Sequence, residues 1–225
     1  MEQDKIWDYF QNEKIDSFNG SYGRLSFLLK NIKPGSKVLN IGVGGAILEK
    51  IALSKKIDVY SLDPSEKSIE KLQKLIGKDK AKVGYSQNIP FCSNYFDVVI
   101  MSEVLEHLSD EVIEKTLKEV NGVLKKGGRF MDTVPYDENL SEQMVICPKC
   151  GEKFHRWGHV QSFDKIKMSK LLEKNFSNVI VSPKMFISWN ILNWKGKIAT
   201  IINYLFYYVG IKKSGLNLYF EGTKI

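Results

Sequence analysis

The sequence predicts an α/β fold, with a mostly parallel β-sheet between layers of helices. Apolar runs of strand length alternate with helical patterns, as in consecutive βαβ units. The run 96–101 (FDVVIM) is apolar on both faces, as in a central strand. The length of 225 residues suits one such domain with a decorating insertion, so we expect a single domain over residues 1–225.

Seven segments have the length and composition of strands. They are 37–41, 57–62, 81–85, 96–101, 129–134, 178–182 and 216–221. Helices are predicted at 4–17, at 20–31, from a glycine turn to about residue 53, at 65–76, at 110–124 and at 164–175. Lys125–Gly128 is predicted to end the helix 110–124, because basic residues followed by glycine are typical of helix C-termini. The last strand contains NLYFEG, which resembles a protease tag site and which we interpret as a native strand.

The chain is expected to consist of a core and three additions. N-terminal helices occupy residues 1–34 and the core occupies 35–135. A polar insert with Cys and His residues spans 136–163, and an aromatic helical insertion spans 186–213.

Composition excludes several classes of protein. The chain has 33 Lys+Arg against 26 Asp+Glu, and no acid lies between Glu173 and Glu221, so the basic excess belongs to one C-terminal feature. Only three arginines are present, which disfavours a nucleic-acid binder. Three cysteines exclude a disulfide scaffold. The sequence contains no run of about 18 apolar residues, so we expect no membrane-spanning helix. The acidic start MEQDKIWDYF is unlike a signal peptide, so we expect a cytoplasmic enzyme.

A glycine turn follows the first predicted strand and suggests a nucleotide-like ligand. Gly42 and Gly44 stand where the strand ends and a helix begins, and glycine there lets a ligand approach the backbone. Asp63 follows Gly42 by 21 residues, at the end of the second strand, where a carboxylate can accept both hydroxyls of a ribose. Nicotinamide-dependent dehydrogenases share this signal, but their third glycine would fall at Ile47 here.

These residues and three further segments resemble the class I S-adenosylmethionine-dependent methyltransferases, especially the small-molecule group. The matching segments are VLNIGVGGA (38–46), SLDPS (61–65), NIPFCSNYFDVVIMSEVLEHL (88–108) and KKGGRF (125–130). The resemblance implies a Rossmann-like seven-stranded sheet whose last strand is antiparallel, with residues 35–135 binding the cofactor.

The resemblance also assigns roles to individual residues. Glycines of the turn would line the methionine part of the cofactor, Asp63 would hold the ribose, Gln87–Ile89 would edge the adenine, and Ser102 would lie under the methionine end. The complete set implied is Asn40, Gly42, Val43, Gly44, Asp63, Pro64, Gln87, Asn88, Ile89 and Ser102. The family commonly has an acid where this chain has Asn40, and an Asp near the adenine where it has Tyr85.

His107 is the candidate catalytic residue, because it follows the fourth strand near the edge where acceptors bind. On a helix, Glu103 and His107 would share a face. The alternative is that His107 is a packed histidine in the strand-to-helix turn. Glu103 and Glu106 are interpreted as solvated helix surface.

Cys147, Cys150, His155 and His159 form a C-x2-C-x4-H-x3-H pattern that predicts a structural Zn²⁺ site in the insert. Two alternatives remain: a redox CxxC pair, or a histidine that faces the acceptor beside incidental cysteines. A catalytic metal is not expected, because four protein ligands leave no open position.

The insertion 186–213 combines seven aromatic residues with bordering lysines. Its apolar run 198–211 would be about 21 Å long as a helix, too short to cross a bilayer core of about 30 Å. An interfacial helix at a membrane, a lid over an apolar acceptor, a core helix and an oligomer contact all fit this pattern.

The sequence as a whole predicts methyl transfer from S-adenosylmethionine to oxygen or nitrogen of a small-molecule or lipid- or glycan-linked acceptor. Nucleic acid is not expected as a partner, because the Asp/Asn-Pro-Pro-aromatic pattern is absent and Ser102–Leu105 stands in its place. The alternatives are a non-catalytic binding module of the same fold and an NAD(P)-dependent oxidoreductase.

Overall fold

A computed structural model describes residues 3–189, 192–208 and 215–225 of the chain. The helices are α1 (Gln3–Glu13), α2 (Tyr22–Leu28), α3 (Ile47–Ser54), α4 (Glu66–Ile76), α5 (Asp110–Val123), α6 (Lys165–Leu172) and α7 (Trp194–Tyr208). Short 3-10 helices include η1 (Ile15–Ser21), η2 (Leu105–His107) and η3 (Leu140–Gln143). The strands are β1 (Lys37–Ile41), β2 (Asp58–Asp63), β3 (Ala81–Val83), β4 (Phe96–Ser102), β5 (Leu124–Pro135), β6 (Met144–Ile146), β7 (Lys153–His155), β8 (Ser177–Lys184) and β9 (Asn217–Thr223).

Seven of the strands form one sheet in the order β3-β2-β1-β4-β5-β9-β8. The pairs from β3 to β5 are parallel, and β9 runs antiparallel to both of its neighbours. This arrangement confirms the predicted Rossmann-like sheet with an antiparallel last strand. The NLYFEG segment forms most of β9, and its residues Leu218 and Phe220 are fully buried.

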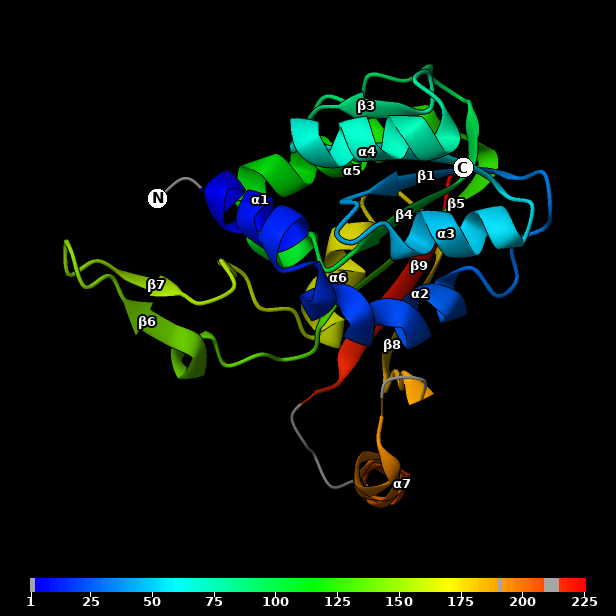
Figure 1. Cartoon of the computed structure of the whole chain (residues 1–225). Coiled ribbons are helices and arrows are strands. Elements are labelled where there is room, and N and C mark those ends of the chain that lie inside the picture. Colours follow the sequence, from blue (N-terminus) through cyan, green and yellow to red (C-terminus); the bar gives the residue numbers. More distant parts are fainter. Residues whose placement is uncertain (1–2, 190–191, 209–214) are drawn as a thin grey trace.

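Helices pack on both faces of the sheet because the central strands are apolar on both faces. On β4, Val98 and Ile100 face α2 and α3, whereas Val99 and Met101 face α5 and α6. Figure 1 shows these helices on opposite sides of the strands. The alternation continues on β1, where Asn40 lies on the same face as Val38, toward α3.

Several element boundaries differ from the sequence-based predictions. The predicted helix 4–17 ends at Glu13, and the chain continues as the 3-10 helix η1. The Lys125–Gly128 segment does not cap a helix: β5 already begins at Leu124 and includes these residues. The strand ladder continues there because Gly127 N–H donates to the carbonyl of Lys224, and Lys224 N–H donates to that of Gly128.

The two inserts extend away from the sheet. Strands β6 and β7 form an antiparallel hairpin that projects from the domain, with Cys147 and Cys150 in its turn (Figure 1). Helix α7 lies apart from the two helical layers. Residues 190–191 and 209–213 of the expected insertion 186–213 lie outside the described residues.

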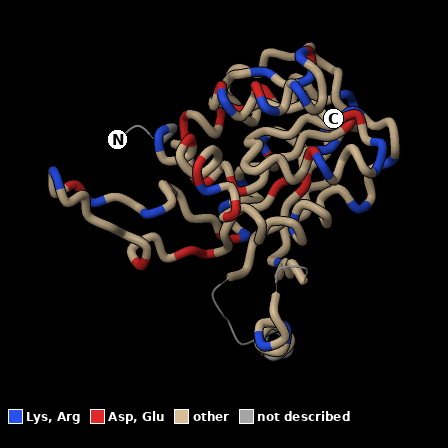
Figure 2. The backbone as a smooth tube through the Cα atoms, in the orientation of Figure 1, with Lys and Arg blue, Asp and Glu red and all other residues tan. Residues whose placement is uncertain are grey.

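Among the described residues, no helix has both the length and the apolar character needed to cross a membrane. Figure 2 shows lysines and acids interspersed over most of the backbone, whereas α7 carries lysines and no acid.

Candidate functional site

A cavity of about 250 Å³ lies at the carboxyl ends of β1, β2 and β4. In parallel α/β sheets this edge is where ligands bind. Helix α1 and the 3-10 helix η1 cover the cavity, through Trp7, Gln11 and Phe18. Eight of the ten expected cofactor-binding residues line it: Asn40, Gly42, Val43, Gly44, Asp63, Pro64, Gln87 and Ser102.

The glycine turn forms the floor of this cavity and requires glycine. Gly42 has φ +85° and Gly44 has φ +47°, in the left-handed region. A side-chain carbon on Gly42 would come within 2.6 Å of the Val104 side chain, and one on Gly44 within 2.9 Å of the Phe18 ring. The Val104 and Phe18 side chains therefore pack directly against this turn, which leaves no room for side chains at positions 42 and 44.

Asp63 ends β2 with its carboxylate buried, at 2 % exposure. Its Oδ2 accepts hydrogen bonds from Val43 N–H at 2.9 Å and Gln11 Nε2 at 3.1 Å, and its Oδ1 accepts one from Ser65 N–H at 2.9 Å. Burial raises the pKa of Asp63, although these hydrogen bonds oppose the rise. The side chain is thus fixed between the glycine turn and α1. Oδ2 already accepts two hydrogen bonds, and Oδ1 retains capacity for a further one.

Beneath the glycine turn, Asn40 is linked to a buried acid. Asn40 Nδ2 and Ser61 Oγ each donate to Glu49 Oε1 at 2.8 Å, and Glu49 is fully buried at the start of α3. Burial raises the pKa of Glu49. Position 40, where the resemblance implies an acid, thus holds an amide that is joined to a carboxyl from the next helix.

The expected adenine edge is only partly at the cavity. Tyr85 and Gln87 line it, but Asn88 and Ile89 do not. Ile89 is buried in the core, and its N–H donates to Glu119 Oε2 at 2.9 Å. Ile89 therefore fixes the turn that carries Gln87, without lining the cavity itself.

The far end of the cavity lies after β4. Ser102 Oγ accepts a hydrogen bond from Arg24 Nε at 2.9 Å and shares another with Thr133 Oγ1. Arg24 Nη1 is 3.8 Å from Glu103 Oε2, and Asn217 Nδ2 donates to Glu103 Oε1 at 3.0 Å. Arg24 and β9 therefore hold Glu103 at this edge.

His107 lines the same end of the cavity and is almost fully buried. Its Nδ1 donates to the Gly158 carbonyl at 3.2 Å, since a carbonyl can only accept, so Nε2 carries the lone pair. None of the described residues offers Nε2 a hydrogen-bond partner, and the Trp7 ring packs edge-on at a centroid distance of 4.5 Å. Burial, and then the nearby His159, lower the pKa of His107 to about 3, so the ring is neutral.

Glu106 is not surface, contrary to the interpretation from sequence. It is 1 % exposed, and neither of its carboxylate oxygens has a hydrogen-bond partner in the part of the chain that the structure describes. Its backbone carbonyl accepts from Val160 and Gln161 N–H, so the end of the insert covers it. Burial raises the pKa of Glu106 well above its ordinary value, and the neighbouring Glu103 raises it further.

The structure does not bring the four residues of the Cys/His pattern together. The rings of His155 and His159 stack at 4.5 Å, and both face Glu138. Cys147 and Cys150 are free thiols in the hairpin turn, and Cys150 is exposed. The groups of possible metal ligands within reach of one another contain the histidines with Glu138, Glu106 and His107, and contain no cysteine.

Sequence reasoning missed the residues that other elements bring to the cavity. Trp7, Gln11 and Phe18 come from the N-terminal helices, and Glu49 of α3, which does not line the cavity, supports Asn40 from beneath. Their positions carry no motif. Only the tertiary packing of α1 and η1 across the strand ends reveals the first three.

Comparison with known proteins identifies the family. Residues 39–131 match the model of a methyltransferase domain. The chain is 30% identical over 186 residues to the ubiquinone biosynthesis O-methyltransferase of Pelagibacter ubique, covering 79% of this chain and 74% of that protein. It is 32% identical over 224 residues to the demethylmenaquinone methyltransferase of Staphylococcus saprophyticus, covering 80% of this chain and 91% of that protein.

Solved structures share the fold. A chain from the complex of the Haloferax volcanii Trm112 methyltransferase activator with a methyltransferase superposes with a TM-score of 0.69 and 18% identity, over 99% of this chain and 97% of that one. A SAM-dependent methyltransferase from Archaeoglobus fulgidus superposes with a TM-score of 0.64 and 16% identity, over 98% of this chain and 99% of that one. Sequence relatives, sheet order and the cavity agree, and the chain belongs to the class I S-adenosylmethionine-dependent methyltransferases.

Proposed function

We propose that this methyltransferase transfers the methyl group to a hydroxyl oxygen of a small-molecule acceptor. The observation that carries the proposal is the neutral, unpartnered Nε2 of His107 at the end of the cavity beyond Ser102. Methylation of a hydroxyl requires removal of its proton, and a buried lone pair beside the acceptor serves that step. The name of the Pelagibacter relative, an O-methyltransferase, supports the same class of acceptor.

The cofactor would bind between the glycine turn and Asp63. Its amino-acid end would lie along the turn at Gly42 and Gly44, which carries no side chains, and Asp63 Oδ1 would accept a hydrogen bond from a ribose hydroxyl. Gln87 and Tyr85 would border the adenine, and Ser102 would lie near the methionine end. When bound, S-adenosylmethionine supplies an activated methyl group on a sulfonium sulfur. This chain orients the acceptor, excludes water beneath Trp7 and receives the proton.

The test has a binding arm and a transfer arm. Calorimetry with S-adenosylhomocysteine should show one site per chain, and Asp63→Asn should weaken its binding at least tenfold, since a charged hydrogen-bond acceptor is lost. The exposed Asp79→Asn is the matched control and should bind as the wild type. Methyl transfer should then occur to phenols or alcohols in an acceptor panel. Lack of binding would favour the non-catalytic module, and products formed only on amines would overturn the hydroxyl assignment.

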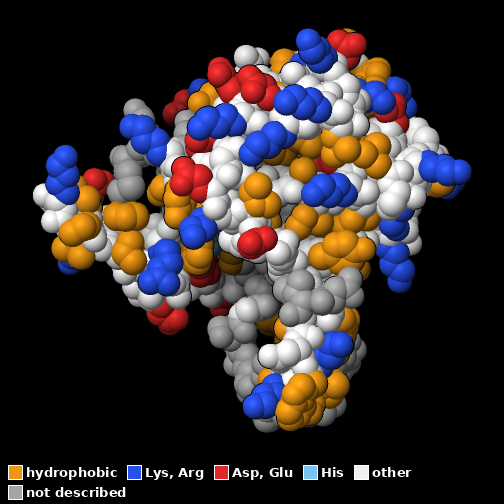
Figure 3. Space-filling model, viewed as in Figure 1, with side chains coloured by type: hydrophobic (Ala, Val, Ile, Leu, Met, Phe, Trp, Pro, Cys, Tyr) orange, Lys and Arg blue, Asp and Glu red, His pale blue; other side chains and the backbone are white. Residues whose placement is uncertain are grey.

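We also propose that α7 contacts an anionic membrane surface, where a lipid-linked acceptor would be reached. Trp194, Ile198 and Ile201 recur at helical spacing and are 68%, 50% and 50% exposed. Figure 3 shows apolar and basic side chains together on this projecting element. An amphipathic helix with aromatic and Lys residues is typical of interfacial binding.

A further inference from the structure

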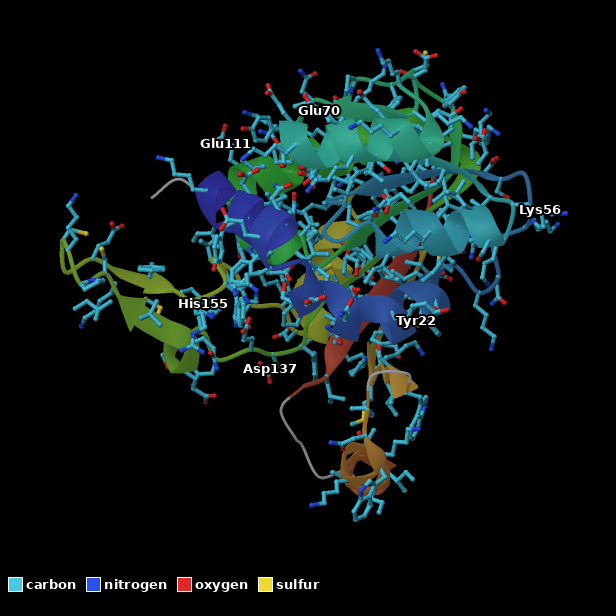
Figure 4. The ribbon with its side chains drawn as sticks, viewed as in Figure 1. Tyr22, Lys56, Glu70, Glu111, Asp137 and His155 are labelled. Carbon is cyan, nitrogen blue, oxygen red and sulfur yellow. The ribbon has the colours of Figure 1, made fainter. Side chains whose placement is uncertain are left out.

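A cluster of three side chains that could bind a metal ion lies beside the end of the cavity where His107 is located. Glu106, His107 and His159 each offer one ligand atom, and these atoms lie within 4.8 Å of one another. The first two residues belong to η2, after β4, and His159 belongs to the loop after the β6–β7 hairpin. Figure 4 shows His155, the last residue of β7, where the hairpin meets the body of the domain.

The polar atoms at this point are buried and unpartnered. Both carboxylate oxygens of Glu106 and Nε2 of His107 lack a hydrogen-bond partner, and Nε2 is 4.0 Å from Glu106 Oε1. Because Nδ1 of His107 donates to the Gly158 carbonyl, Nε2 carries a lone pair, and this lone pair lies near the carboxylate oxygens of Glu106. A buried carboxylate without a donor is costly, and a cation between these atoms would satisfy all of them at once.

His159 is oriented as a ligand by Glu138. Its Nδ1 lies at hydrogen-bond distance from Glu138 Oε2. A carboxylate accepts the Nδ1 proton, which leaves the other ring nitrogen free for a metal, an arrangement common around protein-bound metals. Glu138 therefore acts as the positioning residue of His159.

His155 is excluded as a ligand by its hydrogen bond. Its Nδ1 accepts from the backbone N–H of His159 at 3.1 Å, so its Nε2 carries the proton and faces Glu138 Oε1 at 3.7 Å. Of the two possible groups that share His159, only the one with Glu106 and His107 presents unprotonated atoms from both histidines.

The surrounding charge favours a cation. Burial raises the pKa of Glu106, and two acids, Glu103 and Glu138, lie close enough to raise it further. Burial, and then Glu106 and Glu103, likewise raise the pKa of Asp132. The positive charge of Arg24 opposes both rises. Asp132 is fully buried, and its Oδ2 is unpartnered. A divalent ion would neutralise a group of acids that the fold otherwise buries at a cost.

We propose that Glu106, His107 and His159 bind a divalent first-row transition-metal ion at the acceptor end of the cavity. Two imidazoles and one carboxylate suit ions such as Mn²⁺ and Zn²⁺ and leave coordination positions open. Of the three ligands, His107 lines the cavity. With the ion bound, Nε2 is a ligand and no longer the free base, so the proton of the acceptor hydroxyl would pass to a water or hydroxide held at an open position of the ion. A bound hydroxyl loses its proton more readily on such an ion. That last role rests on the proposed function, whereas the binding of the ion does not.

The experiment measures metal binding on the full chain, freed of metal by a chelator and without cofactor. Titration with Mn²⁺, followed by electron paramagnetic resonance, should show one site with a dissociation constant in the micromolar range. Glu106→Gln and His159→Asn should each weaken binding at least 100-fold, and Glu138→Gln about 10- to 100-fold. Glu111→Gln removes an exposed acid and should have no effect, and Cys147→Ser/Cys150→Ser should bind as the wild type.

Two further readouts keep the proposal open to refutation if a variant folds poorly. Pulsed resonance on wild-type protein with Mn²⁺ should show nitrogen couplings from coordinated imidazole. Thermal unfolding should be shifted upward by Mn²⁺ or Zn²⁺ in the wild type and not in Glu106→Gln. The site would be overturned if neither ion bound below millimolar concentration. Unchanged metal binding in both Glu106→Gln and His159→Asn would also overturn it, as would loss of metal binding in the double cysteine variant. Metal binding without S-adenosylhomocysteine binding would instead overturn the proposed function and leave this site standing.

Discussion

Ala46 holds a backbone conformation that suits glycine. It stands at the start of α3 with φ +59° and ψ 28°, in the left-handed region, where a Cβ costs about 1–2 kcal/mol. Ala46→Gly should therefore raise the free energy of unfolding by about 0.5–1 kcal/mol, after allowing for the greater entropy of the unfolded glycine chain. Denaturant unfolding measures the change. Ala52→Gly, at a buried position inside the same helix, is the control and should lose about 1 kcal/mol or more. Equal losses in both variants would contradict the strain argument.

Sequence reasoning located residues of the cavity where local backbone geometry determines the residue type, and it failed where distant packing does; their role in cofactor binding stays a prediction. Gly42, Gly44 and Asp63 were found because a strand-to-helix turn and a strand end need those residue types. Glu106 was misread because the segment after β4 forms a 3-10 turn, and because the insert, more than fifty residues on, covers it. A pattern read along the chain contains no information about that cover.

At the scale of elements, α1 is the lid of the cavity, because it buries Asp63. Gln11 Nε2 donates to Asp63, and Gln11 Oε1 accepts from Ser68 Oγ at 2.8 Å, so one side chain attaches α1 to β2 and α4. Gln11→Ala removes both hydrogen bonds, each worth about 1 kcal/mol. Stopped-flow mixing with S-adenosylhomocysteine should then show association about 3- to 10-fold faster than for the wild type. The exposed Glu13→Ala, at the end of the same helix, should leave the rate unchanged, and an unchanged rate in Gln11→Ala would show that α1 does not limit entry.

The second prediction at this scale concerns α7. Flotation with vesicles of phosphatidylglycerol should carry the protein upward at low salt, and phosphatidylcholine vesicles or high salt should not, because Lys195 and Lys197 border the apolar side chains. Trp194→Ala/Ile198→Ser should abolish flotation. Ile166→Ser removes a side chain that is 67% exposed on α6, in the body of the domain, and should float as the wild type. Equal flotation of all variants would place any membrane contact elsewhere.

The strands were predicted more accurately than the inserts for a physical reason. A buried parallel strand is a continuous apolar run, so β1, β2 and β4 are visible in the sequence. The β6–β7 hairpin lies outside the core, with Ile146 61% exposed, so no burial pattern predicts it. The Cys/His spacing suggested a compact site there, but the hairpin separates the thiols from the histidines.

On the scale of the whole molecule, the sheet encloses acids whose ionisation opposes folding. Glu49 is the clearest case, because it lies apart from the acceptor end, in contact with Asn40 and Ser61. Burial raises its folded pKa above the unfolded value of about 4.5. Between these two pKa values the folded chain holds a proton that the unfolded chain has lost, so the stability contributed by this group is greatest below about pH 4.5 and falls as pH rises.

Glu49→Gln should remove this dependence while keeping the acceptor oxygen for Asn40 and Ser61. Near pH 7 the variant should therefore be more stable than the wild type, by about 1 kcal/mol or more, and the difference should shrink as the pH falls toward 4.5. Glu49→Ala should instead lose about 2–4 kcal/mol, because it leaves a cavity and two unpaired donors beneath the glycine turn. Denaturant unfolding from pH 4.5 to 8 separates these outcomes. A difference between Glu49→Gln and wild type that stays constant across that range would mean that Glu49 does not change its protonation on unfolding, and the charge beneath the turn would then be present in the folded enzyme.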